Sequence, residues 1–401
     1  MDDSLLPYFL DWANLLLRWL HVVVAIAWIG ASFYFVWLDN HLFKPGGADL
    51  KAKGVDGELW AVHGGGFYNP QKYLVAPANL PQHLHWFYWE SYWTWMSGFA
   101  LFTVLYLFNA DSFLIDKRLH DWSAGAAVAA ALGLLVSGWI VYDLICRLFG
   151  RNKDGSIGND GVVLGLIAVF IVIAAWAAAQ LFAGRAAFLI TGAMIATMMS
   201  ANVFFWIIPG QKQVIADMRA GRAVNPIYGQ RGKQRSVHNT YLTLPVLIAM
   251  LSNHYGMLYT HPLNWAVLCL LMLTGALVRT YFVKRHKGAN AWGLIIVVLA
   301  LLAGLVMWLK PVPMPPAPKA AAATLEQVNA IVQQRCMACH NAQFAQKDVH
   351  LNTPELIEQH AQQIYLQVVI QKTMPLNNAT QITDEERAMI GTWFKARAAT
   401  K

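Results

Sequence analysis

The chain has 401 residues, of which 57% are hydrophobic and only 13% are charged, whereas about a quarter of the residues of a soluble protein carry charge. This composition excludes an ordinary soluble globular protein and predicts a protein that crosses a membrane several times. The net charge of +8 does not indicate a nucleic-acid partner, because the cations are scattered between hydrophobic segments. Only two of the four cysteines lie close together, so a disulfide framework is not expected.

A helix that crosses a bilayer needs about 20 mainly apolar residues, and the chain offers eight such segments. They cover residues 10–38, 86–109, 122–149, 161–183, 186–208, 237–258, 263–283 and 290–309. The first is not a signal peptide, because Asp2 and Asp3 precede it and it runs too long. Pro209 and Gly210 are expected to end the fifth. We therefore predict an all-α membrane domain of eight helices over residues 1–309.

Lysine and arginine residues are distributed unevenly between the two ends of these helices. Sixteen lie in the connections from the first to the second helix, the third to the fourth, the fifth to the sixth and the seventh to the eighth. Only Lys117, Arg118 and Arg185 lie in the connections at the other end. Because cytoplasmic connections carry the excess of Lys and Arg, the N-terminus is predicted to lie outside the cytoplasm. This asymmetry also explains most of the net positive charge.

A short segment rich in proline and alanine, KPVPMPPAPKAAAAT, covers residues 310–324. Its prolines predict a semi-rigid, extended linker. Residues 325–401 have the composition of a soluble domain, but the domain is small for a self-sufficient hydrophobic core. We therefore expect a cofactor to complete this core.

The sequence CMACH, Cys336 to His340, matches the attachment pattern of c-type haem. Cys336 and Cys339 would form thioethers with the two vinyl groups of one haem, and His340 would be an axial ligand of its iron. Met374, in KTMPLNN, is the predicted second axial ligand, and His/Met ligation raises the reduction potential of a haem. Zinc would need further ligands at metal spacing, and a thioredoxin-like site would need a βαβ context.

The tail is similar to a small class I cytochrome c in its CxxCH motif, its Met-Pro loop and its final helix. Trp393 and Phe394 of that helix are predicted to pack on the first helix of the domain, TLEQVNAIVQQR. Haem c is attached outside the bacterial inner membrane. The motif therefore requires an external, periplasmic C-terminal domain, in agreement with the distribution of cations.

Histidines inside the membrane domain are candidate ligands, because buried ionisable groups are costly and imidazole is a usual haem ligand. His21 lies in the first helix, His85 begins the second, and His238 and His254 begin and end the sixth. His238 and His254 are about 24 Å apart along a helix that rises ~1.5 Å per residue, so they cannot bind one iron. We predict an inner haem b on His85 and His238, with His83 as the alternative to His85, and an outer haem b on His21 and His254.

These polar residues also have simpler interpretations. A histidine at a helix end can be an interfacial residue that bonds a lipid headgroup or a carbonyl. Glu90, just inside the second helix, is either a proton relay or the partner of a cation in a loop. Arg18 lies one turn before His21, where it would either meet a haem propionate or extend to the interface.

Two inner connections, HGGGFYNPQKY (residues 63–73) and NPIYGQRGKQRSVHN (residues 225–239), are rich in glycine, aromatic and planar polar side chains. Long loops in compact proteins are usually functional or disordered. Gln230 and Arg231 are candidates for binding a flat, anionic heterocycle by stacking and bidentate hydrogen bonds. Alternatively, these cations only fix the orientation of the helices.

The chain resembles the membrane-bound, cytochrome c-linked urate oxidases (PuuD type), which join an eight-helix membrane domain to a C-terminal cytochrome c. The resemblance rests on five passages: HVVVAIAWIGASFYFVWLDN, HGGGFYNPQKY, PQHLHWFYWESYWTWMSG, SVHNTYLTLPVLIAMLSNHY and CMACH. It implies oxidation of urate to 5-hydroxyisourate in purine catabolism, with electrons passed to haem c rather than to oxygen. It assigns no substrate-binding residue.

These observations together predict an oxidoreductase of the bacterial inner membrane. Urate would be oxidised on the cytoplasmic side, and electrons would pass through haem b to haem c and on to a periplasmic cytochrome or a respiratory oxidase. Two other classes remain open. One is an electron conduit that serves a separate quinol or dehydrogenase partner, and the other is a transporter fused to a redox cytochrome.

Overall fold

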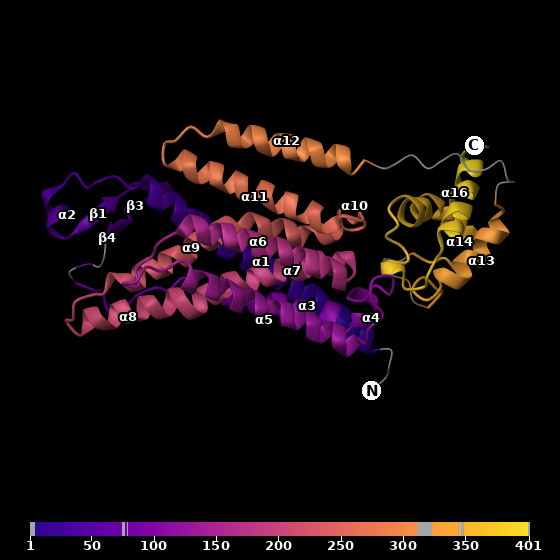
Figure 1. The fold of residues 1–401 in the computed structure, drawn as a ribbon, viewed down its shortest axis with the longest axis horizontal. Helices are drawn as coiled ribbons and strands as arrows, with labels where there is room; N and C mark the ends of the chain where they lie inside the picture. The colour runs from indigo at the N-terminus through magenta and orange to yellow at the C-terminus, as the bar shows by residue number, and fades with distance from the viewer. Residues whose placement is uncertain are drawn as a thin grey trace.

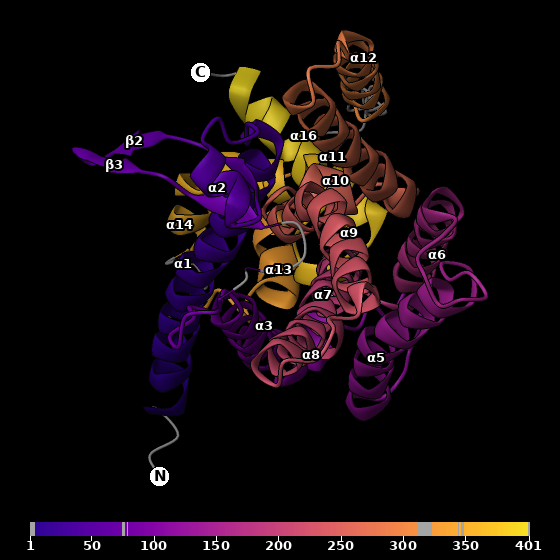
Figure 2. The ribbon, with the colours of Figure 1, turned by 90° about the vertical axis from the view of Figure 1, so that its left-hand side faces the viewer.

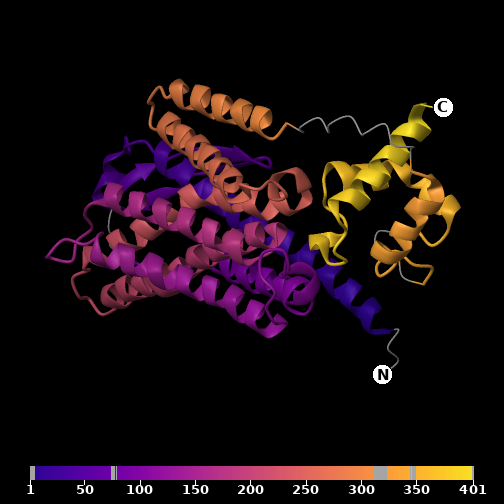
Figure 3. The ribbon, with the colours of Figure 1, turned by 45° about the vertical axis from the view of Figure 1, so that its right-hand side comes forward.

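The computed structural model describes residues 5–73, 77, 79–310, 323–343, 345 and 349–399. The chain forms a long bundle of roughly parallel and antiparallel helices, with a small helical domain at one end (Figure 1). The N-terminal end of α1 lies at the same end of the bundle as this domain (Figures 1 and 3). We call it the outer end and the opposite end the inner end, following the predicted orientation.

Eight helices of the bundle lie at the positions that the hydrophobic segments predict. They are α1 (Leu5–His41), α3 (Trp89–Phe102), α5 (Ala124–Leu148), α6 (Asp160–Leu181), α7 (Gly184–Asn202), α9 (Pro226–Leu251), α11 (Asn264–His286) and α12 (Trp292–Trp308). Helix α7 lies at the centre and packs against α5, α6 and α9, whereas α12 lies at the edge beside α11 (Figure 2).

Within the described part of the chain, five helical stretches are long and apolar enough to cross a membrane. They are Phe9–His41, Ala124–Leu148, Asp160–Leu181, Gly184–Arg219 and Asn264–His286, and α12 is a shorter apolar helix. Helix α3 has only 14 residues before a π-helical turn, η1 (Thr103–Leu107), continues it. The first half of α9 is rich in polar residues, several of which are buried. This helix is therefore not among the five apolar stretches. Membrane-length helices are therefore confirmed, while eight crossings stay a prediction.

The prediction that Pro209 and Gly210 end the fifth helix is wrong. Helix α7 runs through a π-helical turn, η2 (Val203–Ile207), directly into α8 (Ile208–Arg219). A proline inside an α-helix lacks an N–H and clashes with the carbonyl four residues earlier. The π-helical turn widens the backbone just before Pro209, which then lies in the first turn of α8, where proline is tolerated.

Residues 225–239 were predicted to be an inner connection, but the structure shows that most of them are helical. Helix α9 begins at Pro226, and the side chain of Asn225 accepts a hydrogen bond of 3.0 Å from the backbone N–H of Ile227. Asparagine before proline is a strong start signal for a helix, because it caps a free N–H and proline needs none at that position. The start of α9 thus places Gln230, Arg231 and Arg235 on a rigid element.

The connection between α1 and α3 contains β-structure, although the sequence analysis predicted an all-α protein. A short helix, α2 (Ala48–Ala52), is followed by β1 (Val55–Glu58), β2 (Ala61–His63), β3 (Gly66–Tyr68) and β4 (Gln71–Tyr73). Strand β1 pairs antiparallel with β4, and β2 pairs antiparallel with β3 in a hairpin that projects from the inner end (Figure 2). Gly64 and Gly65 form its turn with positive φ angles, which glycine adopts without strain.

Three short elements form the outer end of the bundle. They are α4 (Ala110–Phe113), the 3₁₀ turn η3 (Ser252–His254) and α10 (Gly256–Tyr259). Both α4 and α10 face the C-terminal domain (Figure 1).

The C-terminal domain is helical and has its own hydrophobic core. Its elements are α13 (Leu325–Arg335), α14 (Pro354–Gln359), α15 (Ala361–Ile364), η5 (Tyr365–Ile370), η6 (Leu376–Asn378) and α16 (Asp384–Ala399). Helix α13 packs against α16, and Trp393 is buried in the same core as Val328 and Val332, as predicted. Phe394 also borders this core and stacks on Tyr365, with ring centroids 4.3 Å apart. The core thus forms between the first and last helices of the domain.

Candidate functional site

A cavity of about 440 Å³ lies in the outer part of the bundle, between α1, α3, α7 and α9. This volume is typical of cofactor and small-molecule sites. Most of its lining is apolar. Its polar side chains include Arg18, His21, Arg185, Asn239 and His254. An apolar cavity with a few convergent polar groups is the usual form of a binding site.

His21 is held in this cavity by helix α3. Its Nδ1 lies 3.1 Å from the carbonyl oxygen of Thr94 and 3.1 Å from the hydroxyl of Ser97. Because the carbonyl can only accept a hydrogen bond, this contact favours the tautomer with the proton on Nδ1 and leaves Nε2 as a free electron pair. A Cβ atom at Gly98 would lie 2.8 Å from Cε1 of His21. The absence of a side chain there is what lets the ring approach α3.

His254 reaches the same cavity from η3, at its outer end. The structure therefore brings together the two histidines that were predicted to bind the outer haem b, from segments more than two hundred residues apart. An imidazole that already donates from Nδ1, as His21 does, has the arrangement typical of an iron ligand. The mainly apolar lining with two histidines would suit a haem. Ligation itself stays a prediction.

Two arginines also line the cavity. Arg18 donates a hydrogen bond of 3.0 Å to Asn14 on the same helix, and the guanidinium of Arg185 lies 5.5 Å from the ring centre of Phe113. Arg185 lies in the first turn of α7, and Arg18 lies in the outer half of α1. Guanidinium groups bind carboxylates in a bidentate manner, so these two side chains would suit haem propionates.

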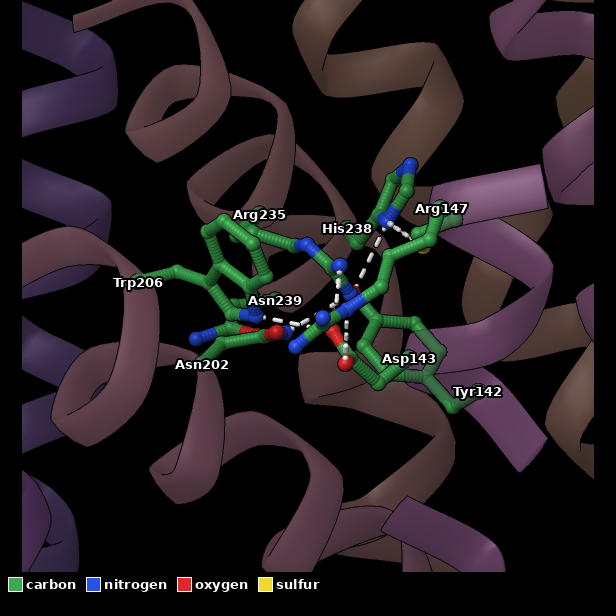
Figure 4. A network of polar contacts seen from close by, with 9 residues as sticks. Tyr142, Asp143, Arg147, Asn202, Trp206, Arg235, His238 and Asn239 are labelled. Atoms are coloured by element: carbon green, nitrogen blue, oxygen red, sulfur yellow. Dashed lines mark hydrogen bonds and ion pairs between the residues drawn. The ribbon is translucent and has the colours of Figure 1, made fainter. Parts of the chain in front are cut away.

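A buried polar network lies nearer the inner end (Figure 4). At its centre the carboxylate of Asp143 pairs with Arg235 at 2.7 Å and with Arg147 at 2.6 Å. Trp206 donates its indole N–H to Asp143 at 2.8 Å. The guanidinium of Arg235 lies 4.9 Å from the ring centre of Tyr142 and 5.1 Å from that of Trp206. A charged side chain at this depth is tolerated because it is paired.

The same network continues to the cavity. The hydroxyl of Tyr142 lies 2.9 Å from Nδ1 of His238, and Asn202 donates to that hydroxyl at 2.8 Å. Asn202 also donates to Asn239 at 2.9 Å, and Asn239 lines the cavity. Nε2 of His238, Nη1 of Arg235 and Oδ1 of Asn202 are buried without a hydrogen-bond partner among the described residues. Hydrogen bonds therefore connect His238 to the deep end of the cavity.

Neither His85 nor His238, the predicted inner haem pair, lines the cavity. His238 is only 1% exposed, and its side chain contacts Tyr142 and Cys146 of α5. His85 and its alternative His83 are exposed in the segment before α3. The inner haem b therefore stays a prediction.

The weaker site candidates lie outside the cavity. Arg231 donates to the carbonyl of Gly155 at 3.0 Å, and Gln230 is exposed. Glu90 lies half-buried in the first turn of α3. Arg231 does belong to a cluster of cations at the inner end. The pKa of Arg151 is lowered, mainly by burial and to a smaller extent by the nearby guanidinium groups of Arg231, Arg147 and Arg235.

In the C-terminal domain, CMACH lies directly after α13. Cys336 caps that helix, and its carbonyl accepts the backbone N–H groups of Cys339 and His340 at 3.1 Å each. Nδ1 of His340 lies 2.8 Å from the carbonyl of Val349, which leaves Nε2 for a metal. Burial raises the pKa of the Cys336 thiol to about 11. The turn thus presents two thiols and one oriented imidazole together.

Met374 borders the hydrophobic core of this domain, as does Cys336. The buried side chain of Arg387 holds the Met374 loop, because it donates to the carbonyl of Met374 at 2.9 Å and to the carbonyl of Val368. The four residues predicted for haem c are therefore compatible with that group in chemistry and placement.

Sequence reasoning missed the centre of the polar network. Tyr142 and Asp143 lie in an otherwise apolar helix, α5, and Asp143 is the one acidic residue of that helix. A lone charge in a hydrophobic segment is a signal for a functional or structural site. Trp206 and Asn202 gave no comparable signal, because their role depends on the turn η2.

The fold and these sites define a helical protein with membrane-length helices, a histidine-lined cavity and a separate helical domain. Residues 7–310 match the family described as urate oxidase N-terminal, and the chain belongs to this family. The match ends beside the predicted end of the membrane domain and leaves the C-terminal domain uncovered. No curated protein and no solved structure matches the chain.

Proposed function

We propose that the protein is a membrane urate oxidase that converts urate to 5-hydroxyisourate and passes the electrons through haem b to a covalently bound haem c. The observation that carries this proposal is the family match over residues 7–310. The reaction adds one water to urate and releases two protons and two electrons. When bound, the two haems supply one-electron acceptors, so that oxygen is not needed.

The residues of the chain suit separate parts of this process. His21 and His254 would hold haem b in the cavity, and Arg18 and Arg185 would bind its propionates. Cys336 and Cys339 would attach haem c, with His340 and Met374 as its axial ligands. The proposal retains only the outer of the two predicted haem b sites, because His21 and His254 both line the cavity and neither His85 nor His238 does.

The inner end suits an anionic substrate. The ring of Trp206 lies 5.0 Å from the guanidinium of Arg147 and 4.9 Å from that of Arg151. With Arg235 and Arg231 nearby, cations outnumber the carboxylate of Asp143 there. Such a field attracts an anion, and we propose that urate approaches from this side, which would face the cytoplasm. The C-terminal domain would then face the periplasm and reduce a cytochrome or a respiratory oxidase.

The test is anaerobic addition of urate to the pure protein while the absorption of the haems is followed. The proposal expects the c-type band to become reduced by urate alone. A double variant, Cys336→Ala with Cys339→Ala, is the control, because it removes both thioethers and should lose the covalent c-type band. Reduction by a quinol but not by urate would favour the electron conduit, and no response to either would favour the transporter. Alkaline pyridine spectra of the same sample report whether b-type haem is present.

A further inference from the structure

The loop that carries Met374 lies against the outer end of the bundle. In this loop the side chain of Asn377 donates a hydrogen bond of 2.6 Å to the backbone carbonyl of Ser112 in α4, and η6 contacts α4 (Figures 1 and 3). Asn377 has a positive φ of 51°, which asparagine tolerates better than most residues. The loop therefore presents this amide to the membrane domain.

A second contact depends on a glycine. A methyl group added at Gly256, the first residue of α10, would overlap Cγ2 of Thr373. Thr373 has little freedom to move, because its hydroxyl hydrogen-bonds to the carbonyl and the side chain of Gln367 at 3.2 and 2.5 Å. β-Branched side chains are also stiff at χ1. The close approach therefore requires glycine at position 256.

The charges at this boundary are complementary. Arg118, in the segment after α4, pairs with Asp116 at 2.5 Å. Asp384 begins α16 in the C-terminal domain. A hydrogen bond from Lys372 lowers the pKa of Asp384, and Arg118 contributes a smaller effect in the same direction across the boundary.

The two contacts join the ligand candidates directly. Gly256 follows His254 by two residues, and Thr373 immediately precedes Met374. We propose that the contacts of Thr373 with Gly256 and of Asn377 with Ser112 form a docking interface for electron transfer within the chain. The interface positions the Met374 side of the C-terminal domain over the His254 end of the cavity.

This inference rests on the proposed function for its two redox centres. With both groups bound, His21 and His254 would hold the electron donor and His340 and Met374 would hold the acceptor, so that one electron would pass from a ferrous haem to a ferric haem. No covalent bond forms or breaks. Gly256, Thr373 and Asn377 are positioning residues that touch neither haem in this scheme.

The experiment compares four full-length proteins with both haems in place: the unaltered chain, Gly256→Ala, Gly256→Ala with Thr373→Ser, and Gly125→Ala. The Thr373→Ser change removes the overlapping methyl group and keeps the hydroxyl. Gly125 begins α5 at the same end, and a Cβ atom there meets nothing within 4 Å. Asn377→Asp is a further variant that keeps the turn preference but cannot donate to Ser112.

Two measurements are made on each protein. A photoreduced flavin delivers one electron, and the transfer from the b-type to the c-type absorption band is timed. Hydrogen exchange of residues 256–260 and 372–378 reports docking without reference to either haem. We expect Gly256→Ala and Asn377→Asp to slow the transfer several-fold and to speed exchange. The double variant should restore both readouts, and Gly125→Ala should change neither.

Unchanged transfer and unchanged exchange in Gly256→Ala would overturn the interface. Faster exchange with unchanged transfer would show that the domain docks there but that electrons take another route, which also overturns the inference. Because the flavin replaces urate, failure of urate to reduce the protein would reject the proposed function alone. Absence of b-type haem would remove the donor and with it this electron route.

Discussion

The cavity in the outer part of the bundle and the polar network in the inner part both contain a histidine, yet the surroundings of the two histidines differ. His21 has one ring nitrogen on α3 and borders about 440 Å³ of space. One ring nitrogen of His238 contacts the hydroxyl of Tyr142, and the other is buried without a hydrogen-bond partner in the described part of the chain. Open space therefore lies beside the imidazole of His21, whereas side chains of the protein surround the imidazole of His238.

The comparison teaches that a histidine in a membrane helix is not by itself a sign of a haem. His238 lies one turn from Arg235, which in turn pairs with Asp143. This histidine therefore belongs to a buried network of polar side chains at the inner end. The helical neighbours of His21, by contrast, are small: Ser97 and Gly98 leave space for the ring. Space next to the ring, more than its depth in the membrane, distinguishes the two.

The largest expected effect separates the two histidines directly. We predict that His21→Ala abolishes the b-type haem spectrum, because it removes an axial ligand from the cavity. His238→Ala is the matched variant and should retain the b-type spectrum. Pyridine haemochrome spectra of the purified variants measure this, with the c-type band as an internal reference. Loss of b-type haem in His238→Ala but not in His21→Ala would reverse the comparison.

Loss of a charge in the polar network should lower the stability of the folded protein more than loss of an exposed charge. Asp143→Asn leaves the buried guanidinium of Arg235 without its partner, since the Arg235 side chain is only 2% exposed. Breaking a buried ion pair costs about 3–5 kcal/mol, so we expect a clear fall in thermal stability in detergent. Arg147→Gln is the control. That side chain is 51% exposed, and its loss should cost about 1 kcal/mol or less.

Much of the fold could be predicted, because hydrophobic length is a strong signal in a membrane protein. The approximate positions of the bundle helices followed from it. The packing of Trp393 in the C-terminal core followed instead from the similarity of the tail to a class I cytochrome c. The errors came from local backbone chemistry. Pro209 does not end a helix when the π-helical turn η2 precedes it, and Asn225 with Pro226 begins α9 earlier than hydropathy indicated.

The candidate site could be predicted only in part. The pairing of His21 with His254 followed from their similar depth in the membrane. Depth alone also suggested His85 with His238, and that pairing stays a prediction, because neither residue lines the cavity. The Tyr142 contact of His238 could not be predicted, because Tyr142 comes from a third helix that spacing along the sequence does not specify.

A smaller effect tests whether the space beside His21 matters. Gly98→Ala would place a methyl group 2.8 Å from Cε1 of His21. Overpacking of this kind costs about 1–3 kcal/mol, so we expect weaker binding of haem b and an altered electron paramagnetic resonance spectrum of its iron. Gly30→Ala on α1 is the control, because a Cβ atom there meets nothing within 4 Å. Identical spectra for both variants would mean that α3 does not position the imidazole.

The smallest effect is expected for a partly exposed ion pair in the C-terminal domain. The stability lost when this pair is broken can be compared with the stability lost when the buried pair of the network is broken. Arg335 contacts Glu386 at 3.0 Å between α13 and α16. Burial acts to raise the pKa of Glu386, but hydrogen bonds from Thr383 and Arg335 outweigh it and leave that pKa below its usual value.

A lowered carboxyl pKa stabilises the folded state above the unfolded value of about 4.3, and this stability is lost as the pH falls through the folded pKa. We expect Glu386→Gln to cost about 1 kcal/mol at neutral pH after solvent screening, and the difference from the unaltered protein to vanish in acid. Thermal unfolding of the C-terminal domain, followed through its haem band at several pH values, measures this. Glu385→Gln, at an exposed neighbour, should behave as the unaltered protein. A cost equal to that of Asp143→Asn would mean that burial adds nothing to the inner network.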